Sequence, residues 1–68
     1  MVNSNLLKGK IMAAGHTQRS LAPKVGMSPN SLNAKISGRN KFDTEEIGKI
    51  CKALGITDPR EKCDIFLS

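Results

Sequence analysis

Residues 18–38 read QRSLAPKVGMSPNSLNAKISG and predict two short helices joined by a tight turn. Ala22 is small enough for the two helices to approach each other closely, and Gly26 can adopt the positive φ that reverses the chain. Met27 is expected to tuck under the turn. Four apolar side chains at helical spacing should form the shared core of the pair: Leu21, Val25, Leu32 and Ile36.

Both helices of this pair carry recognisable end signals. Thr17 is expected to cap a helix over residues 18–25. Ser28 and Pro29 mark the start of the next helix, because proline at the first helical position loses no hydrogen bond. Gly38 is expected to end that helix.

The flanking sequence predicts three further helices and no strand, since no sustained alternation of apolar and polar residues occurs. The expected elements are a helix from Ser4 or Asn5 to Ala14, a helix between the Asp43 cap and Gly55, and a short last helix that begins at Asp58. Capping boxes are expected from Asp43 with Glu46 and from Asp58 with Glu61. The prediction is an all-α, compact five-helix fold in a single domain over residues 1–68.

The chain has 68 residues, which suits one domain with a thin core and leaves little room for an enzyme site. No apolar run approaches the roughly 20 residues that span a bilayer, and the N-terminus lacks the apolar segment of a signal peptide. A cytoplasmic protein with no membrane partner is therefore expected. Cys51 and Cys63 are interpreted as free thiols, with Cys51 in the core, because no further Cys or His pair completes a zinc site.

The positive charge is concentrated in the first part of the chain. Residues 1–42 hold seven Lys and Arg and no acid, whereas residues 43–68 hold four bases and six acids. The two segments carry charges of +7 and −2, which together give the net charge of +5. A nucleic acid is the anionic partner that this asymmetry favours, because each neutralised phosphate releases counterions.

Residues 18–38, together with ISGRNKF (36–42), EIGKICKALGI (46–56) and DIFL (64–67), resemble the lambda-repressor-like, Cro/CI-type (XRE) helix-turn-helix family. The similarity covers residues 5–67 and is closest to small Cro-like phage or prophage regulators of Gram-positive bacteria. It implies a helix-turn-helix at residues 17–38 and repression at double-stranded operator DNA. The expected location is the bacterial cytoplasm, in association with the nucleoid.

Two residues depart from the family pattern. Pro23 lies inside the second predicted helix, where it cannot donate to the carbonyl of Arg19, and we expect a bend there rather than loss of the helix. Lys35 stands where many relatives have an apolar residue. Ile36 is expected to take over the packing that this apolar residue provides in those relatives.

The outer side of the third predicted helix is expected to read bases, because Leu32 and Ile36 face inward. At 100° per residue this side holds Asn30, Asn33, Ala34 and Ser37, with Ser31 on the flank. Asparagine suits the N6/N7 edge of adenine, and alanine suits a thymine methyl group. No arginine lies on this side, so the sequence predicts an operator half-site that favours A·T pairs.

Phosphate contacts are expected from residues at the edges of the reading helix. They are Gln18, Arg19, Lys35, Arg39, Asn40 and Lys41. The N-terminus of the second helix should also favour an anion through its amides and dipole. Such contacts position a protein on DNA without specifying sequence.

Two copies of the chain are expected on DNA, since one such unit contacts few base pairs. The candidates for the dimer contact are Ile65, Phe66 and Leu67 with the fourth-helix region. The same apolar tail could instead fold back and complete the core of one chain.

Three other functions are alternatives to a repressor. An antitoxin that regulates its own promoter belongs to the same class, and a helix-turn-helix that binds a protein partner in place of DNA belongs to another. An enzyme is the third alternative, and the sequence holds no acid–base or metal cluster that would favour it. No cofactor, metal or small-molecule substrate is expected, and His16 is interpreted as a loop residue.

Overall fold

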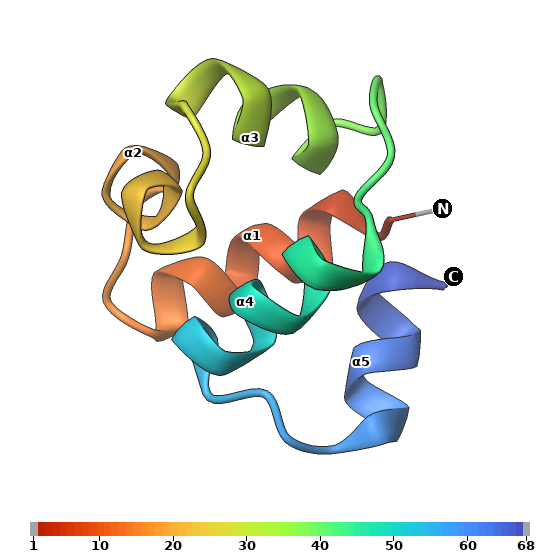
Figure 1. Cartoon of the computed structure of the whole chain (residues 1–68). Coiled ribbons are helices and arrows are strands. Elements are labelled where there is room, and N and C mark those ends of the chain that lie inside the picture. The colour runs from red at the N-terminus through yellow and green to blue at the C-terminus, as the bar shows by residue number, and fades with distance from the viewer. Residues whose placement is uncertain (1, 68) are drawn as a thin grey trace.

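A computed structural model describes residues 2–67, which form short helices connected by loops (Figure 1). Their bounds are α1 (Ser4–Ala13), α2 (Gln18–Leu21), the 3₁₀-helix η1 (Ala22–Val25), α3 (Pro29–Ile36), α4 (Thr44–Leu54) and α5 (Pro59–Phe66). No strand occurs within residues 2–67. The all-α, five-helix prediction is confirmed.

Most helix ends follow the predicted capping residues. Thr17 caps α2 as predicted, and at the start of α1 the Asn3 side chain accepts from the Leu6 N–H. The capping box of α4 is confirmed, since the Asp43 side chain accepts from the Glu46 N–H at 2.7 Å and Glu46 accepts from the Asp43 N–H at 2.9 Å.

The second predicted capping box is wrong. Asp58 caps α5, but its side chain accepts from the N–H of Arg60 at 2.9 Å. Glu61 forms an ion pair with Lys10 of α1, with 2.7 Å between Nζ and Oε1. α1 packs against α5 and brings Lys10 close to Glu61. The Glu61 carboxylate therefore binds this cation and does not complete the predicted capping box.

The second predicted helix is α-helical only to Leu21 and continues as the 3₁₀-helix η1. The change occurs near Pro23, which has no N–H to donate, so an α-helix cannot continue regularly through it. A tighter helix replaces the expected bend. Gly26 then adopts φ of 72°, and the Met27 N–H donates to the carbonyl of Ala22 at 3.0 Å, which closes the turn.

One hydrophobic core lies between the helices. Its buried residues are Leu7, Ile11, Leu21, Ala22, Val25, Leu32, Ile36, Ile50, Cys51, Ile56, Ile65 and Phe66. Ala22 is fully buried, as its predicted role requires. Met27 packs partly buried against the core.

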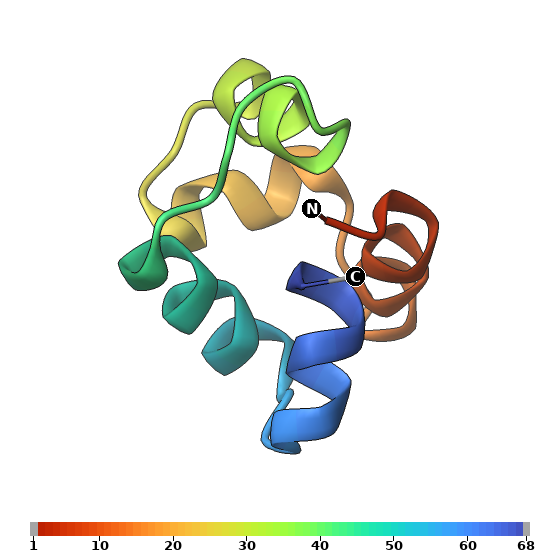
Figure 2. The ribbon, with the colours of Figure 1, turned by 90° about the vertical axis from the view of Figure 1, so that its right-hand side faces the viewer.

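The last helix stands beside α1 and α4, and its last turn lies next to the start of α1 (Figure 2). The Asn3 N–H donates to the carbonyl of Ile65 at 2.6 Å. Ile65 and Phe66 are buried in the core of the single chain, whereas Leu67 is 71% exposed. Of the three dimer candidates, only Leu67 therefore keeps an accessible side chain.

Candidate nucleic-acid interface

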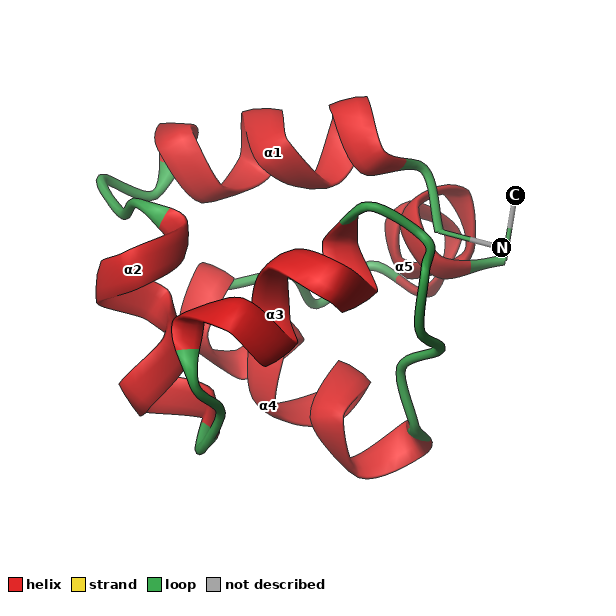
Figure 3. Ribbon diagram, turned by 90° about the horizontal axis from the view of Figure 1, so that it is seen from above, coloured by secondary structure: helices red, strands yellow, loops and turns green. Residues whose placement is uncertain are grey.

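α3 lies on an outer face of the molecule. Figure 3 looks down on this helix, and no other helix crosses in front of it. Leu32 and Ile36 are fully buried on its inner side, as their spacing predicts. Asn30, Ser31 and Asn33 are exposed. α3 is therefore amphipathic, with a polar side open to a partner.

Both ends of α3 are held by serine hydroxyls. Ser28 caps the N-terminus, where its Oγ accepts from the Ser31 N–H at 3.2 Å. At the other end the Ser4 hydroxyl, from the first turn of α1, donates to the carbonyl of Ile36. A helix C-terminus leaves carbonyls without intrahelical partners, so the contact from Ser4 stabilises this end. Nothing in the local sequence indicates this contact, because the two residues are 32 positions apart in the chain.

The predicted base-reading residues differ in their availability. The carboxamides of Asn30 and Asn33 make no hydrogen bond to any group in residues 2–67, and Ala34 is partly exposed beside them. Ser37 lies just beyond the last residue of α3. Its hydroxyl donates to the Ala34 carbonyl at 3.1 Å and accepts from Arg39 Nε at 3.2 Å. Ser37 is thus already engaged in the turn that ends the helix.

At the N-terminal side of the motif, Arg19 is exposed and Gln18 is partly buried. Thr17 and Ser20 cap α2 reciprocally, because each side-chain oxygen accepts from the other residue's backbone N–H. The sequence pattern does not indicate this capping box, because Ser20 replaces the usual Glu or Gln. The predicted dipole effect is weak here, since α2 has only four residues.

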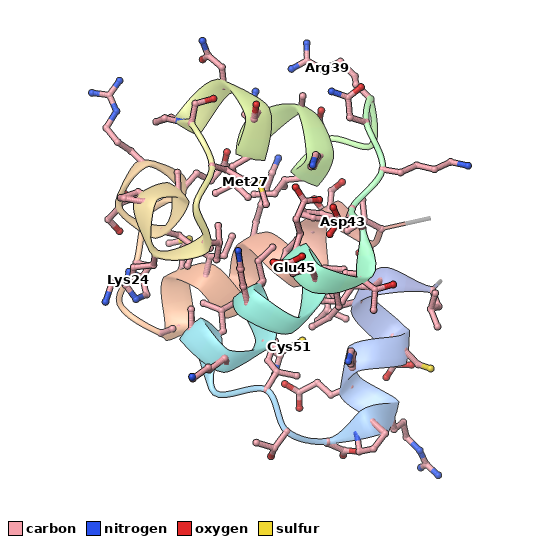
Figure 4. The ribbon with its side chains drawn as sticks, viewed as in Figure 1. Lys24, Met27, Arg39, Asp43, Glu45 and Cys51 are labelled. Atoms are coloured by element: carbon pink, nitrogen blue, oxygen red, sulfur yellow. The ribbon has the colours of Figure 1, made fainter. Side chains whose placement is uncertain are left out.

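At the C-terminal side, Arg39, Asn40 and Lys41 are exposed in the loop that follows α3. The backbone N–H groups of Arg39 and Asn40 both donate to the carbonyl of Ala34, at 2.9 and 3.2 Å, and tie the loop to the helix. Figure 4 shows Arg39 at the outer end of α3, while Lys24 lies on a different side of the molecule.

Lys35 departs from its predicted role. Its ammonium group forms an ion pair with Glu46 in the first turn of α4, and both side chains are about four-fifths buried, with 19% and 18% of their surface exposed. A charge already paired in this way is poorly placed to hold a DNA phosphate. Ile36 is fully buried, as expected if Ile36 packs in the core in place of an apolar residue at position 35.

The charge asymmetry of the sequence is partly cancelled in the fold. Glu46 pairs with Lys35 and Glu61 with Lys10, so two acids of the second half neutralise two of the seven cations in residues 1–42. Within residues 2–67, the other five cations of that segment form no ion pair: Lys8, Arg19, Lys24, Arg39 and Lys41. Arg19, Arg39 and Lys41 precede or follow α3 in the chain and supply free positive charge around it.

The remaining reactive side chains of residues 2–67 include His16, Cys51 and Cys63. His16 Nδ1 lies 3.2 Å from Ser20 Oγ, but this hydroxyl also binds the backbone of Thr17 within the cap. Burial raises the pKa of the Cys51 thiol, with a further contribution from Glu61 that Lys62 opposes. Cys63 is exposed. Within the described residues, no group of three His, Cys, Asp or Glu could hold a metal ion.

Comparison with known proteins agrees with this geometry. A family model described as helix-turn-helix matches residues 7–61, which include the Gly26 turn and all of α3. No curated protein matches the sequence. No helix within residues 2–67 has the length and apolar character needed to cross a membrane.

Proposed function

The chain belongs to the Cro/CI-type helix-turn-helix family of DNA-binding transcriptional regulators, and we propose that it is a Cro-like repressor that reads operator DNA with α3. The observation that carries this proposal is the exposed, uncharged side of α3, where Asn30 and Asn33 have no partner in residues 2–67. Free cations lie at either end of the motif. An α-helix with its side chains is about 10–12 Å in diameter, which fits the major groove of B-DNA at a width of about 12 Å.

In this proposal the base contacts come from Asn30, Ser31, Asn33 and Ala34. The two carboxamides would each bind an adenine edge, and the methyl group of Ala34 would contact a thymine. Arg39 lies beyond the end of α3 and not on its outer side, so no bidentate contact to guanine is expected from the helix itself. The operator half-site should therefore favour A·T pairs.

The phosphate contacts are proposed to come from Arg19 and Gln18 at one end and from Arg39, Asn40 and Lys41 at the other. Their exposure and free charge support this role for the three basic residues. Lys35 is left out of the set because Glu46 holds it. Contacts of this type supply affinity and position, while the α3 side chains supply sequence preference.

The test combines footprinting with one double variant. Protein is footprinted on the DNA that flanks its own gene at two salt concentrations, and paired protected half-sites with steep salt sensitivity are expected. Asn30→Ala with Asn33→Ala should abolish the preference for that site and leave binding to random duplex almost unchanged. If the double variant protects the same site with unchanged affinity, α3 does not read the DNA.

We further propose that two copies bind together through an apolar hollow of about 620 Å³. It is bounded by Val2, Ser37, Gly38, Asn40, Lys41, Phe42, Ile47, Phe66 and Leu67. The hollow lies beside the C-terminal end of α3, so a second copy seated there would bring a second α3 near the first. Reading two successive major grooves requires such helices about 34 Å apart.

Leu67→Asp tests the dimer, because it places a charge on the exposed apolar side chain of the hollow. We expect a lower sedimentation-derived mass and weaker operator binding. Met12→Asp is the matched control, since Met12 is 77% exposed on α1 and lies outside the hollow. Equal masses for the two variants and the unmodified protein would contradict the assignment of this surface.

A further inference from the structure

Glu46 connects the start of α4 to the end of α3. One carboxylate oxygen, Oε1, accepts from the Asp43 N–H at 2.9 Å and completes the α4 cap. The other, Oε2, accepts from the ammonium group of Lys35 in the last turn of α3. A single side chain therefore fixes the start of one helix and holds the only cation of α3.

The ion pair of Lys35 with Glu46 is more deeply buried than an ordinary surface ion pair. Lys35 and Glu46 retain 19% and 18% of their side-chain exposure. The neighbouring pair of Lys49 and Glu45 retains 50% and 79%, with 3.4 Å between its charged atoms. Salt screens exposed charges strongly and partly buried pairs much less. The pair between α3 and α4 should therefore persist at the salt concentrations under which DNA is bound.

A free lysine in the last turn of α3 would bind a phosphate of any sequence. Each such contact raises the affinity for random duplex and steepens the salt dependence of binding, with a slope of about 0.9 for each phosphate neutralised. We propose that Glu46 is a specificity-determining and positioning residue, which keeps Lys35 away from the DNA backbone and fixes α3 against α4. This inference rests on the proposed function of α3.

Glu46→Gln tests the inference while preserving the helix cap. Glutamine can also form a capping box, so the contact to the Asp43 N–H should remain while the negative charge is lost. The slope of log affinity against log salt on random duplex should steepen by about 0.9. The affinity should then fall about 3.5-fold more than that of the unmodified protein between 50 and 200 mM salt. The ratio of operator to random-duplex affinity should decrease.

Three further proteins separate this effect from a change in net charge. Glu45→Gln changes the charge equally on the adjacent residue, which pairs with Lys49, and should leave the slope unchanged. Lys35→Met should also leave it unchanged, since Lys35 makes no phosphate contact in the unmodified protein. The double variant Glu46→Gln with Lys35→Met should return to the original slope. Thermal unfolding of each variant verifies that it is folded.

Two results would overturn the inference. One is a Glu46→Gln slope equal to that of the unmodified protein or of Glu45→Gln. The other is a shallower slope for Lys35→Met, which would mean that Lys35 already contacts a phosphate. Failure of the proposed function looks different, because the unmodified protein itself would then show no salt-dependent binding to duplex DNA.

Discussion

The rings of Phe42 and Phe66 meet edge to face, with their centroids 5.5 Å apart and their planes at 86°. Phe42 closes the loop that carries Arg39, Asn40 and Lys41, and Phe66 belongs to the last turn of α5. The contact therefore attaches the loop proposed to bind phosphate to the hydrophobic core. Because the anchor already orders the loop, less conformational entropy of the loop backbone is lost when its side chains bind DNA.

A double-mutant cycle measures this anchor. Phe42→Leu and Phe66→Leu each remove one ring, and the two together remove both. An edge-to-face pair contributes about 0.5–1.5 kcal/mol beyond its buried area, so the two effects on the free energy of unfolding should be non-additive by about that amount. Urea denaturation of the four proteins gives the coupling energy. Simple additivity would show that the rings act independently.

Arg39→Ala should weaken binding to all duplexes to a similar extent. The expected cause is loss of one phosphate contact, which makes the salt slope shallower by about 0.9. Fluorescence anisotropy with operator and random duplexes at several salt concentrations measures both effects. Lys24→Ala is the control, since Lys24 is also an unpaired cation but lies on another side of the molecule. Equal losses from both variants would favour a diffuse charge effect.

Two glycine substitutions should change stability in opposite directions. Gly26 has φ of 72°, so alanine there is strained by about 1–2 kcal/mol, although a Cβ would meet only Lys49 Nζ at 3.9 Å. Gly9 lies inside α1, where an added Cβ would meet no atom within 4 Å outside the backbone of that helix, so alanine should stabilise the protein by up to about 1 kcal/mol. Chemical denaturation measures both changes. A stable Gly26→Ala protein would contradict the left-handed turn.

The two cysteines should differ in reactivity. Cys63 is exposed and should react rapidly with a thiol reagent in the native protein, whereas buried Cys51 should react only after unfolding. Because burial raises the pKa of Cys51, its protonated form is favoured in the folded state. This contribution to stability is complete below the ordinary thiol pKa of 9.0 and is lost as pH rises further. In the native Cys63→Ser variant Cys51 is the remaining cysteine, and its rapid reaction with the thiol reagent would contradict the burial of Cys51.

Local chemistry was enough to predict most helix ends. Thr17, Ser28 and Asp43 are residues whose side chains accept backbone N–H groups, and each begins a helix at the expected position. Leu32 and Ile36 then determined which side of α3 is buried, and hence which residues are exposed on it. These features depend on neighbours a few residues apart, which the sequence displays directly.

Contacts between distant segments could not be predicted in the same way. Glu46 and Glu61 occupy the same position relative to an aspartate cap, yet only Glu46 completes a capping box. The difference arises because α1 brings Lys10 to Glu61, and nothing near Glu61 in the sequence indicates that contact. The ion pair of Lys35 with Glu46 is likewise not indicated by the local sequence, which is why the sequence predicts a phosphate contact for Lys35.

The hydrogen bond from Asn3 to Ile65 has a consequence for synthesis of the chain. α1 leaves the ribosome before α5, but the backbone group that its capping residue contacts arrives with α5. Side chains of both helices also share the core. The nascent α1 must therefore wait until almost all of these residues have been translated before it can reach its final position.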